Sequence, residues 1–463
     1  MESKGTGKEA HILVFPYPAQ GHINPVLPFS KFLASKGLKV TIIVTPSVKK
    51  LVNFPPNSSI SIERISDGSE DVKETEDIEA YFNRFRREAS QNLAKFIDEK
   101  KGWGAKVIVY DSTMPWVLDI AHERGLLGAS FFTQSCFVSA VYCHLHQGTL
   151  KYPYEEEEKS TLLSLHPLLP TLQINDLPCF SKFDDPKHLV SKHLTDQFIN
   201  LDKVDWILFN TFYDLETQVA EWMKAKWPIK TIGPTSLLEK HKKLGNDKNQ
   251  IISLFEQNHK ACIDQWLDSM ETCSVVYVSL GSIASIGKEE MEELACGLLM
   301  SNCYFLWVVR ASEQDKLPSD FMSLASEKGL IVNWCCQTEV LAHPAVACFM
   351  THCGWNSTLE AISCGVPLVT MAQWVDQQPN AKCVEDLWKV GVRIKGPENG
   401  TFEREEIARC IQQVIGGDNA DELRANAWKW KKLAQDAMEE NGNSTKNIED
   451  FVVQFFNMSL LLT

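Results

Sequence analysis

Short apolar runs rich in β-branched residues alternate with segments of helical period along most of the chain. In the first half, strands are predicted at His11–Phe15, Leu38–Thr45, Val107–Tyr110, Ala129–Thr133 and Trp206–Asn210. Asn24 is expected to cap the first helix, with Pro25 at its first helical position and Gly37 past its end. Alternation of this kind is typical of βαβ units and a parallel sheet.

The alternation stops twice and then resumes. It fades between Lys151 and His193, and again in the Lys- and Asn-rich stretch 239–260. It resumes with strands predicted at Val275–Leu280, Phe305–Val309, Leu330–Trp334, Ala347–Met350 and Pro367–Met371, and the tail from Arg404 onward is helical.

We therefore predict an α/β protein of two doubly wound, Rossmann-like domains facing a central cleft. The predicted division is an N-terminal domain over 1–238, a linker over 239–260, a C-terminal domain over 261–445, and a last helix over 446–463 that packs back on the first domain.

Composition narrows the class of protein. The chain has 463 residues, 44% of them hydrophobic and 23% charged, which fits a packed globular protein. The formal net charge of −14 disfavours nucleic-acid backbones and anionic membranes as partners. No apolar run approaches the ~18 residues that a membrane span needs. We expect a cytoplasmic monomer whose 14 scattered cysteines are reduced.

One segment of the second half suits a nucleoside diphosphate. After the strand ending near Met350, a glycine turn at Gly354 leads directly into a helix, whose first backbone N–H groups can bind phosphate oxygens. His352 can add a donor, Glu360 can accept hydrogen bonds from a ribose diol, and Trp334 offers a flat face for a base. Each residue alone also fits an ordinary role, as a helix cap, a first-turn carboxylate or a core aromatic.

The first half supplies a candidate base. His22 lies in the predicted loop after the first strand, and Asp111 ends a later strand that opens on the same edge of the sheet. An imidazole with an ordinary pKa near ~6.5 can accept a proton at neutral pH, and a carboxylate on its other nitrogen stabilises the imidazolium. The alternative is a turn histidine and an unrelated strand-end aspartate.

These motifs resemble a known family. The segment WCCQTEVLAHPAVACFMTHCGWNSTLEAISCGVPLVTMAQWVDQ, from Trp334 to Gln377, is similar to the 44-residue signature box of plant family 1 UDP-glycosyltransferases. HILVFPYPAQGHINP near the start, YDSTMPW around Asp111, and SLGS at Ser279–Ser282 resemble the same family. The resemblance implies a GT-B fold and inverting transfer from a UDP-sugar to a small secondary metabolite.

The resemblance also implies roles for residues. His22 and Asp111 correspond to the catalytic dyad, and Gln377 at the end of the box corresponds to glucose users, where histidine is associated with galactose. The family pattern has Ala-Pro or Ser-Pro where this chain has Cys335-Cys336, but the uracil contact uses backbone. The donor-binding residues implied are Thr133, Ser282, Trp334, Cys335, Gln337, His352, Trp355, Asn356, Ser357, Glu360, Trp374, Asp376 and Gln377.

The acceptor is the open question. Residues expected at the acceptor are Gly21, His22, Phe85, Met114 and Phe131. A carboxylate is already ionised and hardly needs a base, so we expect a hydroxyl on a steroid, terpenoid or phenolic skeleton. The alternative is a glucose ester or an S-glucoside, formed on a carboxylate or thiohydroximate.

Other classes of protein fit less well. No Asp-x-Asp and no convincing zinc spacing occurs, so we expect no metal and no cofactor, with UDP-glucose as co-substrate. A dehydrogenase should carry a G-x-G-x-x-G turn after a strand, and none is present. A non-catalytic binding module should lack His22 or Asp111, whereas a UDP-glucose hydrolase would use the same residues with water as acceptor.

Overall fold

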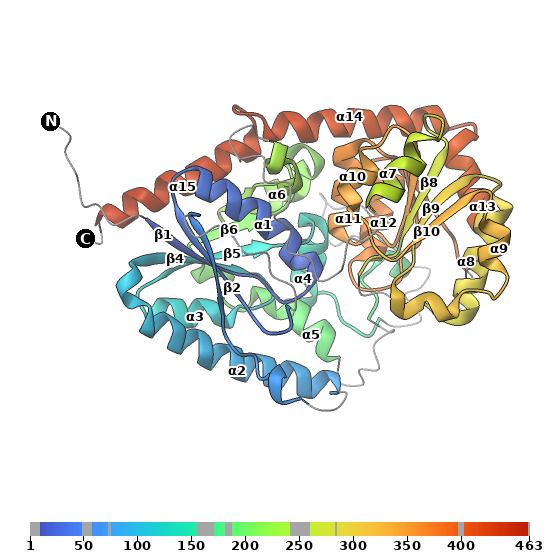
Figure 1. The fold of residues 1–463 in the computed structure, drawn as a ribbon. Helices are drawn as coiled ribbons and strands as arrows, with labels where there is room; N and C mark the ends of the chain where they lie inside the picture. Colours follow the sequence, from blue (N-terminus) through green and yellow to red (C-terminus); the bar gives the residue numbers. More distant parts are fainter. Residues whose placement is uncertain are drawn as a thin grey trace.

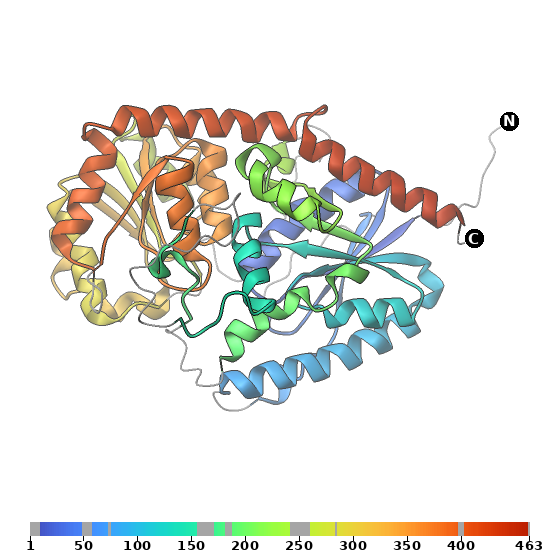
Figure 2. The same cartoon turned by 180° about the vertical axis from the view of Figure 1, so that it is seen from behind.

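The computed structural model describes residues 10–48, 58–72, 76–154, 171–180, 188–240, 260–282, 285–396 and 402–461. The chain forms two lobes, each built on a parallel β-sheet with helices packed around it (Figures 1 and 2). The prediction of two doubly wound α/β domains is confirmed.

The first sheet has seven parallel strands in the order β3-β2-β1-β4-β5-β6-β7. Its strands are β1 His11–Phe15, β2 Lys39–Val44, β3 Ile60–Arg64, β4 Ala105–Asp111, β5 Leu127–Phe132, β6 Trp206–Phe209 and β7 Ile229–Thr231. Its helices are α1 Gln20–Ser35, α2 Ile78–Glu99, α3 Trp116–Glu123, α4 Cys136–His146, α5 Leu189–Thr195 and α6 Thr217–Lys224.

The second sheet has six parallel strands in the order β10-β9-β8-β11-β12-β13. Its strands are β8 Val275–Ser279, β9 Tyr304–Val308, β10 Gly329–Val332, β11 Val346–Thr351, β12 Leu368–Thr370 and β13 Gly391–Arg393. The helices of this half are α7 Lys260–Asp268, α8 Lys288–Met300, α9 Phe321–Ala325, α10 Gln337–Leu341, α11 Trp355–Cys364, α12 Gln377–Lys382, α13 Arg404–Gly416, α14 Ala420–Met438 and α15 Asn443–Leu461.

In each sheet the direction of winding reverses at one pair of strands, β1/β4 in the first sheet and β8/β11 in the second. Ligands of open α/β sheets bind outside the carboxyl ends of the strands at such switch points. His22 follows β1 and Asp111 ends β4, while Ser282 follows β8 and His352 follows β11. The fold therefore places the candidate residues of both halves at the two positions where a ligand is expected.

The first helix begins earlier than predicted. Ala19, not Asn24, is the residue before α1, and His22 lies in the first helical turn rather than in a loop. Pro25 and Pro28 are inside the helix. Pro25 has no amide N–H, so the carbonyl of Gly21, four residues earlier, is left without its usual helical partner. The prediction failed because proline at position 25 was interpreted as a helix start.

The last two helices connect the lobes. α14 runs along one side of the molecule from the second lobe, and α15 continues over the first lobe (Figure 1). Asn447 of α15 donates to the carbonyl of Thr231 at 2.8 Å, and the indole N–H of Trp206 donates to Gln454 at 2.7 Å. These two bonds join α15 to strands of the first sheet. Most of the predicted linker, residues 241–259, lies outside the described residues, and the domain boundaries stay a prediction. Within the described part of the chain, no helix has both the length and the apolar character needed to cross a membrane.

Candidate active site between the two domains

A cavity of about 710 Å³ lies between the lobes, at the carboxyl ends of the strands of both sheets. Its wall combines residues that follow β1 and β5 in the first lobe with residues that follow β8, β10 and β11 in the second. Sequence-predicted residues that line it are Gly21, His22, Thr133, Ser282, Trp334, Cys335, Gln337, His352, Trp355, Asn356, Ser357, Glu360, Trp374, Asp376 and Gln377.

His22 and Asp111 form a hydrogen-bonded pair at the edge of this cavity. Nδ1 of His22 lies 2.6 Å from Oδ2 of Asp111, whose side chain is completely buried, whereas 25% of the His22 side chain is exposed. Thr113 donates to the other carboxylate oxygen through its backbone N–H at 3.0 Å and its hydroxyl at 2.6 Å. Thr133 Oγ1 lies 3.2 Å from the same His22 nitrogen.

The pair is arranged so that His22 can accept a proton. Burial lowers the pKa of His22, but the negative charge of Asp111 and its hydrogen bond outweigh burial, and the pKa is raised. Burial raises the pKa of Asp111, but the positive charge on His22 and the hydrogen bonds from His22 and Thr113 outweigh burial and keep this pKa below its ordinary value. An ionised Asp111 makes Nδ1 the donor, so Nε2 is the nitrogen that remains to accept a proton.

The first turn of α11 faces the cavity directly after β11. The ring of His352 fits between two glycines, because a side chain on Gly281 or on Gly354 would come within 2.6 Å or less of it. Burial lowers the pKa of His352 to about 4, so the imidazole is neutral at pH 7. A hydrogen bond with the backbone of Ser279 partly offsets the effect of burial, and Nδ1 has no partner by hydrogen-bond geometry among the described residues. A neutral ring beside a helix N-terminus can donate one hydrogen bond to an anion, and the helix supplies the positive potential.

A connected set of polar groups lines the next part of the cavity. The amide of Gln337 donates to the Ser357 hydroxyl at 3.0 Å and to Oε2 of Glu360 at 2.8 Å. Burial raises the pKa of Glu360 to about 7, which the Gln337 hydrogen bond only partly offsets. A carboxylate held this way is short of donors, which a pair of vicinal ligand hydroxyls would supply. Trp334 lies in the same wall.

The loop Trp374–Gln377 closes the far end of this wall. Oε1 of Gln377 accepts backbone N–H groups of Gln373 at 2.8 Å and Trp374 at 3.2 Å, so the carboxamide oxygen holds the loop and only its NH₂ group is available to a ligand. Burial raises the pKa of Asp376 to about 6, and Asn380 donates to its carboxylate at 2.9 Å. The charge on Asp376 also contributes to the raised pKa of His22 in the other lobe.

The first lobe contributes an apolar wall next to His22. Tyr17 and Tyr81 share a hydrogen bond of 2.8 Å, and the rings of Phe82 and His193 stack with centroids 4.4 Å apart. Burial lowers the pKa of His193 to about 4, so this ring is neutral as well. These four side chains line the cavity. None of them was among the acceptor residues expected from the sequence; His193 and Tyr17 lie in segments where the sequence shows no clear strand or helix period.

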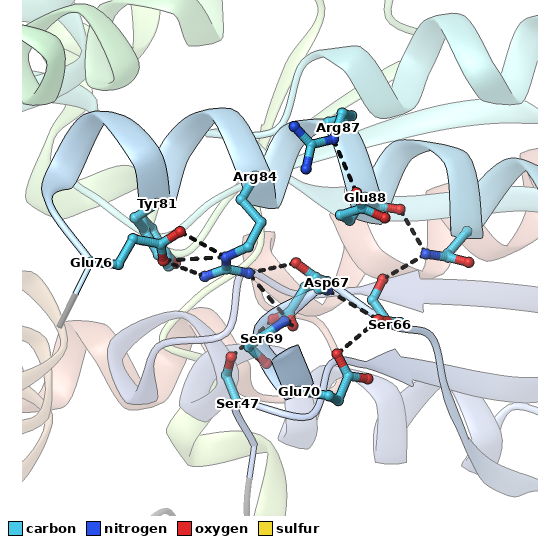
Figure 3. Close-up of polar contacts among 12 residues, drawn as sticks. Ser47, Ser66, Asp67, Ser69, Glu70, Glu76, Tyr81, Arg84, Arg87 and Glu88 are labelled. Atoms are coloured by element: carbon cyan, nitrogen blue, oxygen red, sulfur yellow. Dashed lines mark hydrogen bonds and ion pairs between the residues drawn. The ribbon is translucent and has the colours of Figure 1, made fainter. Parts of the chain in front are cut away.

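A charged cluster lies behind this wall, and its cation, Arg84, is paired within the cluster (Figure 3). Arg84 of α2 binds both oxygens of Glu76, at 2.7 and 2.9 Å, donates to the backbone carbonyl of Asp67, and lies over the Tyr81 ring. Arg86, whose charge also lowers the pKa of His193, is exposed and outside the wall. No lysine or arginine occurs among the described residues that line the cavity.

Three residues expected at the acceptor are elsewhere. Phe85, Met114 and Phe131 are at most 2% exposed, belong to the hydrophobic core and do not line the cavity. Phe85 supports the wall from behind, with its ring centroid 5.3 Å from that of Tyr17. Sequence alone does not show whether an apolar side chain faces the core or the pocket, which is why these expectations were wrong.

Tyr142 of α4 is a polar group without a partner in this cavity. Its side chain is fully buried, it lines the cavity, and its hydroxyl has no hydrogen-bond partner among the described residues. Burial raises its pKa well above the ordinary value, and the charge on Asp376 adds to the effect. No cluster of three or more His, Cys, Asp or Glu side chains able to hold a metal occurs in the described ranges.

Comparison with known proteins gives a consistent result. A family model described as UDP-glucoronosyl and UDP-glucosyl transferase matches residues 246–436. The chain is 50% identical over 457 residues to UDP glycosyltransferase 9 of Catharanthus roseus, covering 95% of this chain and 96% of the relative. It is 45% identical over 452 residues to a mogroside I-E synthase of Siraitia grosvenorii, covering 96% of this chain and 98% of the relative.

Solved structures agree over nearly the full length. The crystal structure of Os79 from O. sativa in complex with UDP superposes with a TM-score of 0.87 at 35% identity, covering 96% of this chain and all of the relative. A UDP-glucose: anthocyanidin 3-O-glucosyltransferase in complex with UDP superposes with a TM-score of 0.83 at 25% identity, covering 98% and 100%.

Proposed function

The chain belongs to the plant family 1 UDP-glycosyltransferases, and from this premise we propose that it transfers glucose from UDP-glucose to a hydroxyl of a small hydrophobic plant metabolite, giving a β-O-glucoside. That it is a glycosyltransferase that binds a UDP-sugar follows from its family and from solved relatives that hold UDP. The choice of glucose, of the acceptor and of the linkage is our proposal. We also propose that the enzyme acts in the cytoplasm as a monomer.

The single observation that carries the proposal is the cavity itself. It brings His22, hydrogen-bonded to a buried Asp111, to the same space as the N-terminus of α11 in the opposite lobe. A base is useful where the acceptor must lose a proton, and a helix N-terminus is useful where a leaving diphosphate gains charge.

In the proposed mechanism the acceptor oxygen attacks the anomeric carbon of the sugar from the face opposite UDP. Nε2 of His22 takes the hydroxyl proton as the new C–O bond forms, and Asp111 stabilises the imidazolium. The bond between the anomeric carbon and the diphosphate breaks with its electron pair going to UDP. Backbone N–H groups of the first α11 turn and the neutral His352 ring donate to the departing diphosphate. One displacement inverts the configuration, so an α-linked donor gives a β-glucoside.

The acceptor wall supports a neutral, hydrophobic acceptor. Its aromatic rings and uncharged histidine offer apolar surface, and the described wall holds no cation that could pair with a carboxylate. The charge of Asp376, which acts on His22, would further disfavour an anion beside the base. A steroid, terpenoid or phenolic skeleton fits this surface, and a solved relative 35% identical to this chain was crystallised with a trichothecene.

The function is tested with acceptors in matched pairs, each skeleton presented once with a hydroxyl and once with a carboxyl group. Incubation with UDP-glucose and mass spectrometry should show one added hexosyl group on the hydroxyl members. Products confined to carboxyl or thiol acceptors would favour the ester or S-glucoside alternative, and free glucose without a conjugate would indicate a hydrolase.

We further propose that transfer needs no metal, because the helix N-terminus and the His352 ring can bind the diphosphate directly. Transfer that continues in excess chelator supports this. Loss of transfer that Mg²⁺ or Mn²⁺ restores would contradict it.

A further inference from the structure

The loop expected to hold the sugar is held by the opposite lobe. The N–H of Val375 donates to the carbonyl of Cys179 at 2.5 Å, and the N–H of Cys179 donates back to Val375 at 3.3 Å. The two residues form an isolated antiparallel bridge. Cys179 belongs to the first half of the chain, between α4 and α5, whereas Val375 lies between Trp374 and Asp376 of the loop.

Val375 needs such support. Its φ is +57°, in the left-handed region that β-branched residues rarely adopt. A backbone in this state persists only where surrounding contacts hold it, and such residues gather at functional sites. Within the loop, Oε1 of Gln377 holds the neighbouring N–H groups of Gln373 and Trp374. The N–H and the carbonyl of Val375 itself bond to the other lobe.

A buried ion pair anchors the segment that carries Cys179. Asp176, 2% exposed at its side chain, ends the short 3₁₀ turn Ile174–Asp176 and lies 2.7 Å from Arg393 and 3.3 Å from Lys382. Arg393 is on β13, and Lys382 ends α12, the helix that starts at Gln377. The same Asp176 carboxylate accepts the N–H of Gln173 at 2.9 Å. One buried carboxylate of the first lobe therefore binds two cations of the second lobe, one of them on the helix that continues the loop.

We propose that residues 173–180, here called the strap, determine sugar selectivity by fixing the shape of the loop Trp374–Gln377, with Asp176 as the positioning residue that anchors the strap. The proposal rests on the proposed function, because it takes the loop as the sugar-binding element. It adds that the acceptor lobe, through the strap, sets the geometry of the donor sugar site. Asp176 touches no reacting atom and acts through Val375, Asp376 and Gln377.

The strap and the nucleotide-facing residues are separate in the structure. Gln337 donates to Ser357 and to Glu360, and neither bond involves the strap. Trp334 lines the same part of the cavity. Loosening the strap should therefore weaken recognition of the sugar and leave recognition of UDP nearly intact. This difference distinguishes a positioning role from a general loss of folding.

The test compares Asp176→Asn with wild type for binding of UDP and of UDP-glucose by calorimetry, and for competition between UDP-glucose and UDP-galactose. We expect UDP affinity to change less than about twofold, while kcat/KM with UDP-glucose falls roughly ten- to a hundredfold, since small misplacements of a reacting group have effects of that size. The preference for one sugar over the other should narrow as well. The matched control is Glu293→Gln, which removes a carboxylate paired with Arg404 away from the cavity. It should leave the UDP affinity, kcat/KM with UDP-glucose and the sugar preference unchanged.

Two further variants keep the proposal testable if Asp176→Asn folds poorly. Lys382→Gln removes only one of the two cations and should give a smaller change in the same direction. Val375→Gly removes the cost of the left-handed backbone, and in the Asp176→Asn background it should restore part of the lost kcat/KM.

The outcomes separate the two proposals. A wild-type enzyme that does not use UDP-glucose contradicts the proposed function. A wild type that uses it, together with Asp176→Asn and Lys382→Gln variants of unchanged sugar preference and UDP-glucose kcat/KM, overturns the role of the strap. Equal losses for UDP and UDP-glucose would also overturn it, because they would indicate a general structural defect.

Discussion

The side-chain amide of Asn356 donates a hydrogen bond to the backbone carbonyl of Gly21, across the boundary between the two lobes. Gly21 precedes His22 in the first turn of α1, and its carbonyl is free because Pro25 has no N–H to offer it. Asn356 is in the first turn of α11, where the diphosphate is expected. The element that receives the leaving group is thus bonded to the segment that carries the base.

A second bond supports the same arrangement. The indole N–H of Trp355 donates to the carbonyl of Asn210, in the first lobe, at 2.8 Å. Together these contacts hold the two halves of the cavity in one geometry, as an in-line displacement requires.

Glu360 should make UDP binding depend on pH. Burial raises its pKa from 4.5 to about 7, so in the free enzyme it is protonated below pH 7. Ribose hydroxyls donate to the ionised form, so UDP affinity should rise as the pH increases through 7 and level off above. Binding at pH 6 should release a proton, measurable by calorimetry in two buffers that differ in ionisation enthalpy.

The matched variant is Glu360→Gln, which keeps the shape of the side chain and removes the charge. It should weaken UDP binding by about 1–3 kcal/mol and abolish both the pH dependence and the proton release. Because the folded pKa lies above the unfolded one, ionisation of Glu360 also lowers the stability of the free enzyme between about pH 4.5 and 7. Wild-type UDP affinity that is flat with pH, and unchanged in the variant, would contradict a ribose contact.

Gln377 should have two separable roles. Its oxygen holds the backbone of its own loop, so only the NH₂ group is free for the sugar. Gln377→Glu keeps an acceptor for the loop and loses the donor, so kcat/KM with UDP-glucose should fall roughly ten- to a hundredfold. Gln377→Ala should lose both the acceptor that holds the loop and the donor for the sugar. Gln377→His should shift the sugar preference towards UDP-galactose in competition assays. Equal sugar ratios and rates in all three variants would show that Gln377 does not touch the sugar.

Tyr142 should contact a bound substrate through its hydroxyl. A buried hydroxyl without a partner costs stability, so Tyr142→Phe should melt at the same temperature as wild type or higher. If the hydroxyl bonds to the substrate, its removal costs about 0.5–1.5 kcal/mol of transition-state stabilisation, and kcat/KM falls roughly two- to tenfold.

The control for Tyr142 is Tyr110→Phe, a buried tyrosine that is bonded to Ser130 and does not line the cavity. It should lose stability and keep the activity per folded molecule. Unchanged kinetics in Tyr142→Phe would mean that the hydroxyl makes no bond to the substrate.

Much of the fold could be predicted because buried parallel strands are runs of apolar residues. β1 was predicted at its observed bounds, and most other strands within two residues. The short edge strands β3, β7 and β13 were missed, since three to five residues with partly exposed or interrupted patterns resemble loops. The strap was also not predicted, because only the tertiary structure brings Asp176 to Arg393 and Lys382.

The candidate site could likewise be predicted only in part from the sequence. The residues after β11 lie in one contiguous motif, so the sequence already shows that they are close in space. His22 and Asp111 are 89 residues apart. Their strands were expected to open on the same edge of the sheet, but it was the resemblance to the family that paired the two residues, and β1 and β4 are indeed neighbours. The acceptor wall depends on which face of α2 points inward: Phe85, expected at the acceptor, faces the core, and Tyr81 of the same helix lines the cavity.

The most direct test of the central claim is the effect of His22→Ala on transfer to a hydroxyl acceptor, measured together with UDP affinity by calorimetry. General base catalysis contributes about 10²- to 10⁴-fold, so transfer should fall by that factor while the dissociation constant for UDP stays within about twofold, because His22 lies in the lobe opposite the nucleotide-facing residues. Asp111→Asn should also slow transfer, since it removes the charge that orients and stabilises the histidine. Retention of most of the transfer rate by His22→Ala, with UDP binding intact, would contradict the claim that His22 is the base.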